Sequence, residues 1–261
     1  MKLLSISGIN RLPVDEKDAI FISFIPEILL DRFHIPCDFT DPVGNRLLEI
    51  DSDSGSADFS LRLKSSYADQ DPLLYAHVTD TMNRQIHVLL YIVNDPTSPR
   101  FDVDVMPDGT STEFGMFRRN IQAEELAMEA GLAPGQIRRG LRVLKHSIKS
   151  FETFASALRH DLFFIEPLYY HNAVIFERYG FSYMKGRRIM EGIDFGFEPG
   201  EAISRLLNSS SPFRLPEYAR SIRGRSWAIH DGILGHAFTD VTMYKVVEKV
   251  AGINTFPNSE W

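Results

Sequence analysis

The chain has 261 residues, of which 44% are hydrophobic and 24% are charged, a composition typical of a globular protein with one large domain or two small ones. Its formal net charge of −7 disfavours nucleic acid and anionic membranes as main partners. The one cysteine, Cys37, excludes an intramolecular disulfide and any zinc site built from several cysteines. Polar residues interrupt the short N-terminal apolar patch, and no apolar run reaches the length of about 20 residues that spans a bilayer. A cytoplasmic protein without membrane segments is therefore expected.

The first quarter of the chain predicts helix, loop and strand in that order. Residues Lys17 to Phe33 carry apolar side chains near helical spacing, and Pro26 is expected to break or kink this helix. The stretch from Pro36 to Tyr67 is rich in Asp, Ser and Gly, which predicts a loop. Its acidic part, residues 51–58, could chelate calcium, but it lacks the ligand spacing of an EF-hand, so a solvated turn is preferred. A strand is expected to resume at Phe59–Leu63.

Three strands in succession are expected next. Residues 73–93 predict a hairpin, because two apolar runs flank a polar turn at residues 81–84. Strict alternation then predicts a third strand over residues 100–106. In that strand Asp102 and Asp104 would lie on one face and the apolar residues on the other.

The middle of the chain predicts two helices. An acidic helix is expected over residues 120–131, inside a segment, residues 108–133, that we interpret as an insertion. A long amphipathic helix is expected to begin at Pro134, since proline suits a first helical position and apolar residues recur after it at spacings of three, four or seven.

A compact unit of strand, break and helix follows. The continuous apolar run Leu162–Ile165 predicts a strand covered on both faces. Glu166 and Pro167 mark a break, after which a short helix is expected from about His171 to Tyr179. Gly180 is placed to end this helix in a left-handed conformation.

The last part of the chain is expected to be an extension of residues 196–261, attached to a domain of residues 1–195. It predicts a short helix around residues 199–207 and an amphipathic helix over residues 239–250. The apolar face of the second helix could pack on the domain or on a partner subunit. A homodimer through this extension is therefore a hypothesis.

Two groups of histidines bear on metal binding. His77 and His87 flank the hairpin turn and would face each other in one register, although a slip of one residue would turn one of them away. His230, Asp231 and His236 are also of metal-ligating types, but the glycines between them indicate a turn. The preferred interpretation is that neither group holds a metal.

The order of elements from Asp161 to Phe181 resembles the C-terminal half of the GNAT-type N-acetyltransferase superfamily. In that family a central strand splays from its neighbour and is followed by a short helix with a Tyr-Glu-Lys-Leu-Gly-Phe-like signature, which stands here as Phe176–Phe181. The end of the third expected strand, Val105–Asp108, resembles the Val-x-Pro-Glu/Asp of many GNAT proteins. The resemblance covers residues 73–193. It implies a mixed α/β, mostly antiparallel sheet flanked by helices, the acyl-CoA N-acyltransferase fold.

The resemblance also implies coenzyme A as cofactor, with its pyrophosphate at a glycine-containing loop before a helix. Aligning Pro107 directly puts the family's glycines on Ser111, Glu113 and Gly115, where Glu113 would repel phosphate. The favoured alignment starts the family's third helix at Pro134. It assigns acetyl-CoA or another acyl-CoA to Gly135, Gln136, Arg138, Arg139 and Gly140, with Asn172 as a further candidate. The alternative is that the basic residues form only the solvated face of an amphipathic helix.

The resemblance suggests candidate catalytic bases, and it shows that this sequence lacks the family's usual Tyr general acid. Several GNAT proteins carry a catalytic carboxylate on the strand before the coenzyme A loop, which makes Asp102 and Asp104 candidates, and Glu166 and His171 at the mouth of the splay are further ones. The alternative for Asp102 and Asp104 is a solvent-facing edge of the sheet. Many GNAT enzymes use a Tyr on the helix after the splayed strand as general acid. Phe176 stands at that position here, so Tyr179 is the candidate, with neighbouring tyrosines on another turn as alternatives.

The sequence therefore predicts a divergent acyl-CoA-dependent N-acyltransferase that acts on a small amine. One alternative is a non-catalytic binding protein of the same fold that has lost the phosphate loop and the Tyr acid. Another is a metal-binding protein that uses His and Asp ligands.

Overall fold

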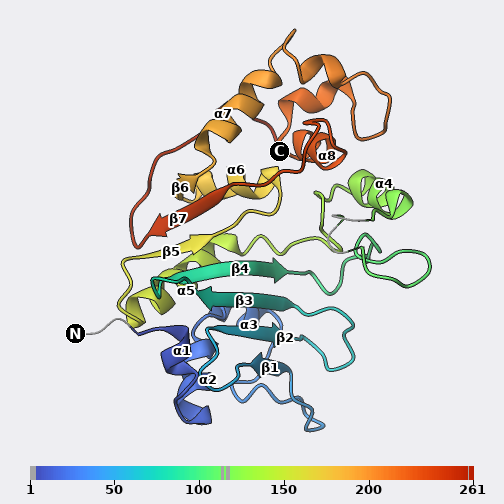
Figure 1. Ribbon diagram of the computed structural model, residues 1–261. Coiled ribbons are helices and arrows are strands. Elements are labelled where there is room, and N and C mark those ends of the chain that lie inside the picture. The colour runs from blue at the N-terminus through green and yellow to red at the C-terminus, as the bar shows by residue number, and fades with distance from the viewer. Residues whose placement is uncertain (1–3, 113–114, 116–117, 258) are drawn as a thin grey trace. The chain divides into compact units, whose positions relative to one another are not determined.

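The computed structural model describes residues 4–112, 115, 118–257 and 259–261. In these residues the fold is mixed α/β, with a seven-stranded, mostly antiparallel sheet flanked by helices, which confirms the expected fold class (Figure 1). The strands are β1 (Leu48–Asp51), β2 (Asp58–Leu63), β3 (Leu74–Asp80), β4 (Ile86–Val93), β5 (Leu162–Ile165), β6 (Ser182–Lys185) and β7 (Thr242–Val246). The α-helices are α1 (Ile6–Ile9), α2 (Val14–Ile22), α3 (Glu27–Arg32), α4 (Ile121–Glu129), α5 (Leu144–Ala157), α6 (Tyr170–Arg178), α7 (Arg187–Gly196) and α8 (Ile222–His230).

The strands follow the order β1-β2-β3-β4-β5-β7-β6. From β1 to β4 each strand pairs antiparallel with the next, and β4 then pairs with β5 in parallel orientation. The hairpin expected over residues 73–93 is confirmed as β3 and β4, which pair from Leu74↔Val93 to Asp80↔Ile86. The strand expected at Phe59–Leu63 is confirmed as β2.

The chain divides into two compact units, each assembled from several segments. The first unit comprises residues 1–97, 140–166 and 244–250, and the second comprises residues 98–139, 167–243 and 251–261. β7 lies across this division, because Thr242 and Met243 belong to the second unit and its remaining residues to the first. The boundary after residue 195 that the sequence suggested stays a prediction.

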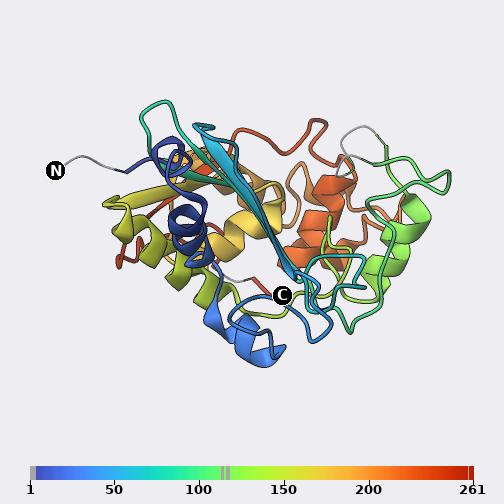
Figure 2. The same ribbon diagram turned by 90° about the horizontal axis from the view of Figure 1, so that it is seen from below.

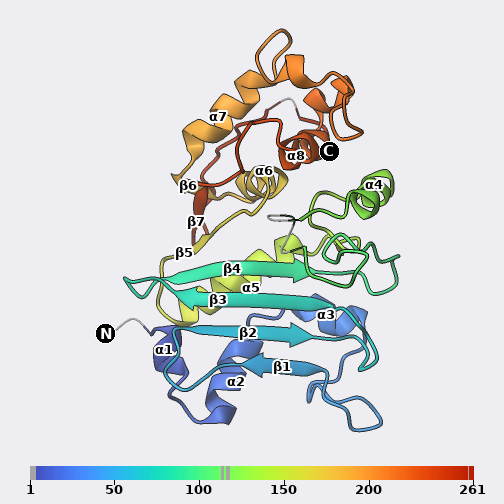
Figure 3. The same cartoon turned by 45° about the vertical axis from the view of Figure 1, so that its right-hand side comes forward.

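An aromatic core holds the first unit together. Alternation along β2 buries Phe59, which stacks on Phe21 of α2 with ring centroids 4.0 Å apart. Phe24, which follows α2, stacks on Phe151 of α5 at 4.3 Å. The helices α2, α3 and α5 therefore lie next to one another against the same side of the meander, as Figures 2 and 3 show. This packing fixes α5 against the centre of the sheet.

Several local signals in the sequence are confirmed. Pro26 is the N-cap of α3 and separates it from α2, so the helix expected over Lys17 to Phe33 is broken where predicted. The expected strand Leu162–Ile165 is β5, and the expected acidic helix is α4. Gly180 follows α6 with a φ of +85°, the left-handed conformation predicted for it.

The strand predicted over residues 100–106 does not form. Arg100 instead makes ion pairs with both Asp102 and Asp104, and the backbone turns around Val103. Val103 is buried in a small apolar cluster with Ala123, Ala127 and Leu132. The alternating aspartates therefore stabilise a local turn in this segment through their ion pairs with Arg100.

The helix predicted to begin at Pro134 begins at Leu144. Between them the chain makes turns, and Gly135 and Arg142 have φ values of +78° and +59°, which a right-handed helix excludes. The helix predicted over residues 239–250 is also wrong, because this segment contains the strand β7. The helix predicted around residues 199–207 is reduced to a 3-10 turn at Ser204–Leu206.

Candidate functional site

β4 and β5 pair over a short distance. The paired positions are His87 with Phe164 and Val88 with Ile165. β5 ends at Ile165, whereas β4 continues from Leu89 to Val93, and no strand of the described chain pairs with that stretch on its β5 side. We call Leu89–Val93 the open half of β4. β4 lies between two other strands, but its pairing with β5 ends at Val88, so the open half presents an unpaired edge on that side. The side chains of the open half are all half-buried.

A β-bulge lies at the start of the open half. Val78 of β3 pairs with Val88, but His77 pairs with Leu90, so Leu89 is an extra residue on β4. A bulge bends the strand and increases its local twist. The extra residue, Leu89, directly follows Val88, the last residue of β4 that pairs with β5. The bend therefore occurs where the two strands stop pairing.

The first turns of α5 pack against the open half. The hydroxyl of Tyr91 donates a hydrogen bond to Ser147 Oγ at 2.8 Å, and the Tyr91 ring meets Phe151 edge-on at 4.8 Å. Val143, the N-cap of α5, provides no side-chain cap. Arg142 and Lys145 are exposed on either side of this helix start. The first turn of α5 thus contacts the open half through Tyr91, and this helix start has uncapped N–H groups and two exposed cationic residues near it in the sequence.

Replacing Tyr91 with Phe should lower the free energy of unfolding by about 1 kcal/mol, because it deletes one buried hydrogen bond and keeps the ring. Ser147 is fully buried at 0% exposure and retains its bond to the Val143 carbonyl at 3.2 Å. Urea unfolding measures the effect. The matched control is Tyr75→Phe on β3, which should change stability little; equal losses in both variants would contradict a specific role for the Tyr91 hydroxyl.

His87 and Glu166 lie where the two strands part. Glu166 Oε1 is 3.8 Å from His87 Nε2, which is an ion-pair distance but too long for a hydrogen bond. Burial lowers the pKa of His87, and the nearby Glu166 carboxylate partly opposes this. The imidazole is therefore mainly neutral at pH 7.

The carboxylates and the tyrosine predicted from the sequence fall in different units. Glu166 belongs to the first unit, and Asp102, Asp104 and Tyr179 belong to the second. The aspartates are ion-paired with Arg100, at 2.8 Å for Asp104, so they form part of the local turn. Tyr179 is half-buried just after α6. Their catalytic roles remain predictions.

Polar groups of the predicted coenzyme A loop bond to backbone groups of the loop's flanks and of the segment around Ser98. Gln136 Oε1 accepts a hydrogen bond from the Ala133 N–H at 2.7 Å, and Arg138 donates to the Ser98 carbonyl. Arg139 donates to the Ala130 carbonyl at 3.2 Å. No helix begins in this loop, so the helix-start geometry expected there is absent from it.

The remaining loop candidates lie elsewhere. Gly140 is exposed and belongs to the first unit, and Asn172 lies in the first turn of α6. In the other alignment, Glu113 lies outside the described residues. Gly115 has a φ of +76° and approaches the His230 ring so closely that an added Cβ would lie 2.7 Å from it. The absence of a side chain at Gly115 therefore allows this close contact in the second unit.

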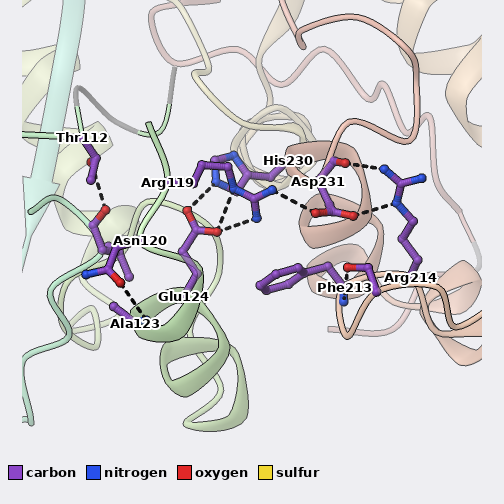
Figure 4. A network of polar contacts seen from close by, with 11 residues as sticks. Thr112, Arg119, Asn120, Ala123, Glu124, Phe213, Arg214, His230 and Asp231 are labelled. Carbon is purple, nitrogen blue, oxygen red and sulfur yellow. Dashed lines mark hydrogen bonds and ion pairs between the residues drawn. The ribbon is translucent and has the colours of Figure 1, made fainter. Parts of the chain in front are cut away.

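A second cluster of titratable groups lies in the second unit. The sequence singled out His230 and Asp231 as metal-ligating types but did not predict the ion-pair cluster that they form here. Figure 4 shows Glu124 of α4 facing Arg119 and His230, while Asp231 lies between Arg119 and Arg214. Glu124 accepts from Arg119 Nε at 2.9 Å and contacts His230 Nε2 at 3.0 Å. Asp231 binds Arg119 at 2.9 Å and Arg214 at 2.7 Å. Every carboxylate in this cluster is bound by Arg or His, which is the pattern of a structural ion-pair network.

Aromatic rings enclose this cluster on one side. The Tyr169 ring lies between His171 and His230, with ring centroids 5.6 Å from each. His171 Nδ1 is 2.8 Å from Ser226 Oγ, and burial lowers the pKa of His171 to about 3. His171 is therefore a neutral, buried hydrogen-bonding group at physiological pH.

The histidines considered as metal ligands have other partners. His77 lies 3.1 Å from Asp58 and pairs in register with Leu90, so it does not face His87. His230 contacts Glu124, and His236 contacts the neighbouring Ala237 carbonyl at 2.9 Å. In the described part of the chain, no group of three or more His, Cys, Asp or Glu side chains is placed to hold a metal ion.

No protein-family model, curated protein or solved structure matches this chain significantly. Among the described helices, none is both long enough and apolar enough to cross a bilayer.

Proposed function

We propose that the chain is an acyl-CoA-dependent N-acyltransferase that acts on a small amine, as its resemblance to the GNAT superfamily implies. The observation that carries the proposal is the two-residue pairing of β4 and β5, after which the open half of β4 pairs with β3 but not with β5. A splay of a central strand from its neighbour is a feature of the family that the sequence resembles.

An unpaired strand edge suits the acyl donor. The extended arm of coenzyme A carries two amide groups, and a strand edge offers N–H and C=O groups at regular spacing to such a ligand. The half-buried side chains of Leu89–Val93 would supply apolar contacts along the same edge. The thioester would then lie near His87 and Glu166, where the strands join.

The start of α5 suits the phosphates better than the loop predicted from the sequence. Its first N–H groups lack a side-chain cap, and the positive end of the helix dipole favours an anion. Arg142 and Lys145 are exposed beside it and could pair with phosphate oxygens. Under this proposal Arg142 and Lys145 take the place of Gly135–Arg139, where Gln136, Arg138 and Arg139 already bond to backbone groups of the chain.

Acetyl-CoA at 100 times its Kd should stabilise the folded chain by about 2.7 kcal/mol and raise its Tm by several degrees. The double variant Arg142→Ala, Lys145→Ala should weaken binding by at least about tenfold, because it removes two cations facing the phosphates. The control is Lys149→Ala, an exposed lysine one turn further along α5. Thermal denaturation and calorimetric titration measure both effects. The absence of any shift with acetyl-CoA or longer acyl-CoAs would contradict the proposal.

A non-catalytic acyl-CoA-binding protein is the second candidate, and Phe176 favours it. This residue stands where many GNAT enzymes have their Tyr acid, and it packs against Phe181 with ring centroids 5.1 Å apart. Such a protein would show the rise in Tm but release no thiol from acetyl-CoA in the presence of amines. Thiol release therefore separates the two candidates.

A further inference from the structure

Building on the proposed acyltransferase function, we propose that His87 is the catalytic base that takes the proton of the attacking amine, with Glu166 stabilising the imidazolium that forms. From the sequence, the candidate bases were three carboxylates and His171, and His87 was considered as a metal ligand. The geometry at the junction of β4 and β5 gives it a different role.

His87 lies at the closed end of the open half. It pairs with Phe164, and the next pair, Val88 with Ile165, is the last before the strands part. Its side chain lies on the face of the sheet opposite the buried Val88, with Thr79 of β3 across from it and the Phe164 ring at 6.4 Å. A ligand that follows the open half toward the junction would therefore end beside this imidazole.

The imidazole has an unused hydrogen-bonding atom. Among the described residues, two buried side-chain polar atoms lack a hydrogen-bond partner, Asn10 Oδ1 and His87 Nε2. Buried polar atoms are nearly always paired, so an orphan beside a strand junction indicates a partner supplied from outside the chain. An amine N–H is a suitable partner in the tautomer that carries its proton on Nδ1, because Nε2 is then the nitrogen that accepts a hydrogen bond.

The surroundings of His87 suit a base that is protonated for part of the reaction. The charged group that faces the imidazole is Glu166, with Oε1 at 3.8 Å from Nε2. The neutral Thr79 and Phe164 lie beside His87. The ring of Tyr244 of β7 packs against the Phe164 ring, with centroids 6.3 Å apart. The His87 side chain is 15% exposed, whereas that of Glu166 is 50% exposed. Glu166 thus reaches solvent and can pass a proton outward from the buried imidazolium.

The step balances without another reactant. The amine nitrogen bonds to the thioester carbonyl carbon, and His87 Nε2 takes one proton from that nitrogen. The tetrahedral intermediate collapses, and the electron pair of the C–S bond leaves with sulfur as the thiolate of coenzyme A. The imidazolium then loses its proton to water past Glu166, so the products are an amide, a thiolate and one proton.

The test compares His87→Gln and Glu166→Gln in the 261-residue chain, with His77→Gln as the matched control. His77 is on the neighbouring strand and forms its own pair with Asp58 at 3.1 Å. Thiol release is followed with acetyl-CoA and a panel of spermidine, glucosamine and the common amino acids. We expect His87→Gln to lower kcat at least about 100-fold, with acetyl-CoA binding and Tm nearly unchanged, and His77→Gln to change kcat less than about threefold.

The pH profile separates the two residues at the junction. The Glu166 carboxylate raises the pKa of His87, so Glu166→Gln should move the acidic inflection of kcat/KM to lower pH and lower the rate less than His87→Gln does. NMR titration of the His87 ring should show the same downward shift without substrate. Abolished turnover in Glu166→Gln together with normal turnover in His87→Gln would make Glu166 the base and overturn this assignment alone. An unmutated chain that neither binds acetyl-CoA nor releases thiol would overturn the proposed function as well.

Discussion

Replacing Glu124 with Gln should lower the free energy of unfolding by about 3 kcal/mol, the cost typical of removing one partner from a buried ion-pair network. The Glu124 side chain is 3% exposed and accepts from both Arg119 and His230. A Gln side chain keeps one acceptor but directs an NH₂ group at one of these donors. Arg119 would then remain largely buried with Asp231 as its one charge partner in this network, a carboxylate that it shares with Arg214.

The loss should depend on pH. Burial raises the pKa of Glu124, but hydrogen bonds from His230 and Arg119 and their charges outweigh this and hold it below its ordinary value of 4.5. A carboxyl group whose pKa is lower in the folded state contributes stability above the unfolded pKa and loses it as the pH falls through the folded value. The gap between the unmutated chain and Glu124→Gln should therefore be full at pH 7 and narrow progressively below pH 4.5.

The control is Glu129→Gln on the same helix, where the side chain is exposed. Its effect on unfolding should stay within about 0.5 kcal/mol. Guanidinium unfolding at pH 7 and pH 4 measures all three proteins. Similar losses in Glu124→Gln and Glu129→Gln, or a gap that widens in acid, would contradict a structural role for the network.

Local chemistry made part of the fold predictable. Pro26 cannot continue a helix, Gly180 tolerates a left-handed φ, and a polar turn at residues 81–84 between two apolar runs marks a hairpin. Each of these signals acts within a few residues. Residues 100–106 show the limit of such reasoning. Their alternation fits a strand, but Arg100 pairs with aspartates two and four residues along and stabilises a turn.

β7 shows why helical spacing can mislead. Met243, Val246, Val247 and Val250 recur at helical intervals, yet the buried residues in the strand are Met243 and Lys245. Lys245 is buried because it pairs with Glu152 of α5 at 3.0 Å, a partner far away in sequence. Long-range pairing therefore decided the structure of this segment, and no local pattern carries that information.

The candidate sites were predictable to different degrees. Glu166 was identified because it follows a buried strand at a proline break, which is a local signal. The contact between Glu124 and His230 joins residues 106 apart in the sequence, so no local signal predicted it. One clue was available: Glu124 lies between Ala123 and Ala127 on the buried face of α4, where an acidic side chain needs a partner.

Replacing Gly135 with Ala should destabilise the folded state by about 2 to 4 kcal/mol, through two separate effects. Its φ of +78° costs a residue with a Cβ about 1 kcal/mol. The added Cβ would also lie 2.4 Å from Tyr169 Cε2 and 2.5 Å from its hydroxyl oxygen. The Tyr169 ring is confined between His171 and His230, so relieving this overlap should cost a further 1 to 3 kcal/mol, roughly the range for overpacking.

Gly200 separates the two effects. It belongs to the same unit and has a φ of +88°, but nothing lies within 4 Å of an added Cβ. Gly200→Ala should therefore show the backbone cost alone, about 1 kcal/mol in urea unfolding. Gly135→Ala combined with Tyr169→Leu should recover part of the excess, because the smaller side chain removes the overlap with the added methyl group. Equal losses at Gly135 and Gly200 would mean that the Tyr169 ring moves freely, and that Gly135 serves its turn without contributing to the packing around His171 and His230.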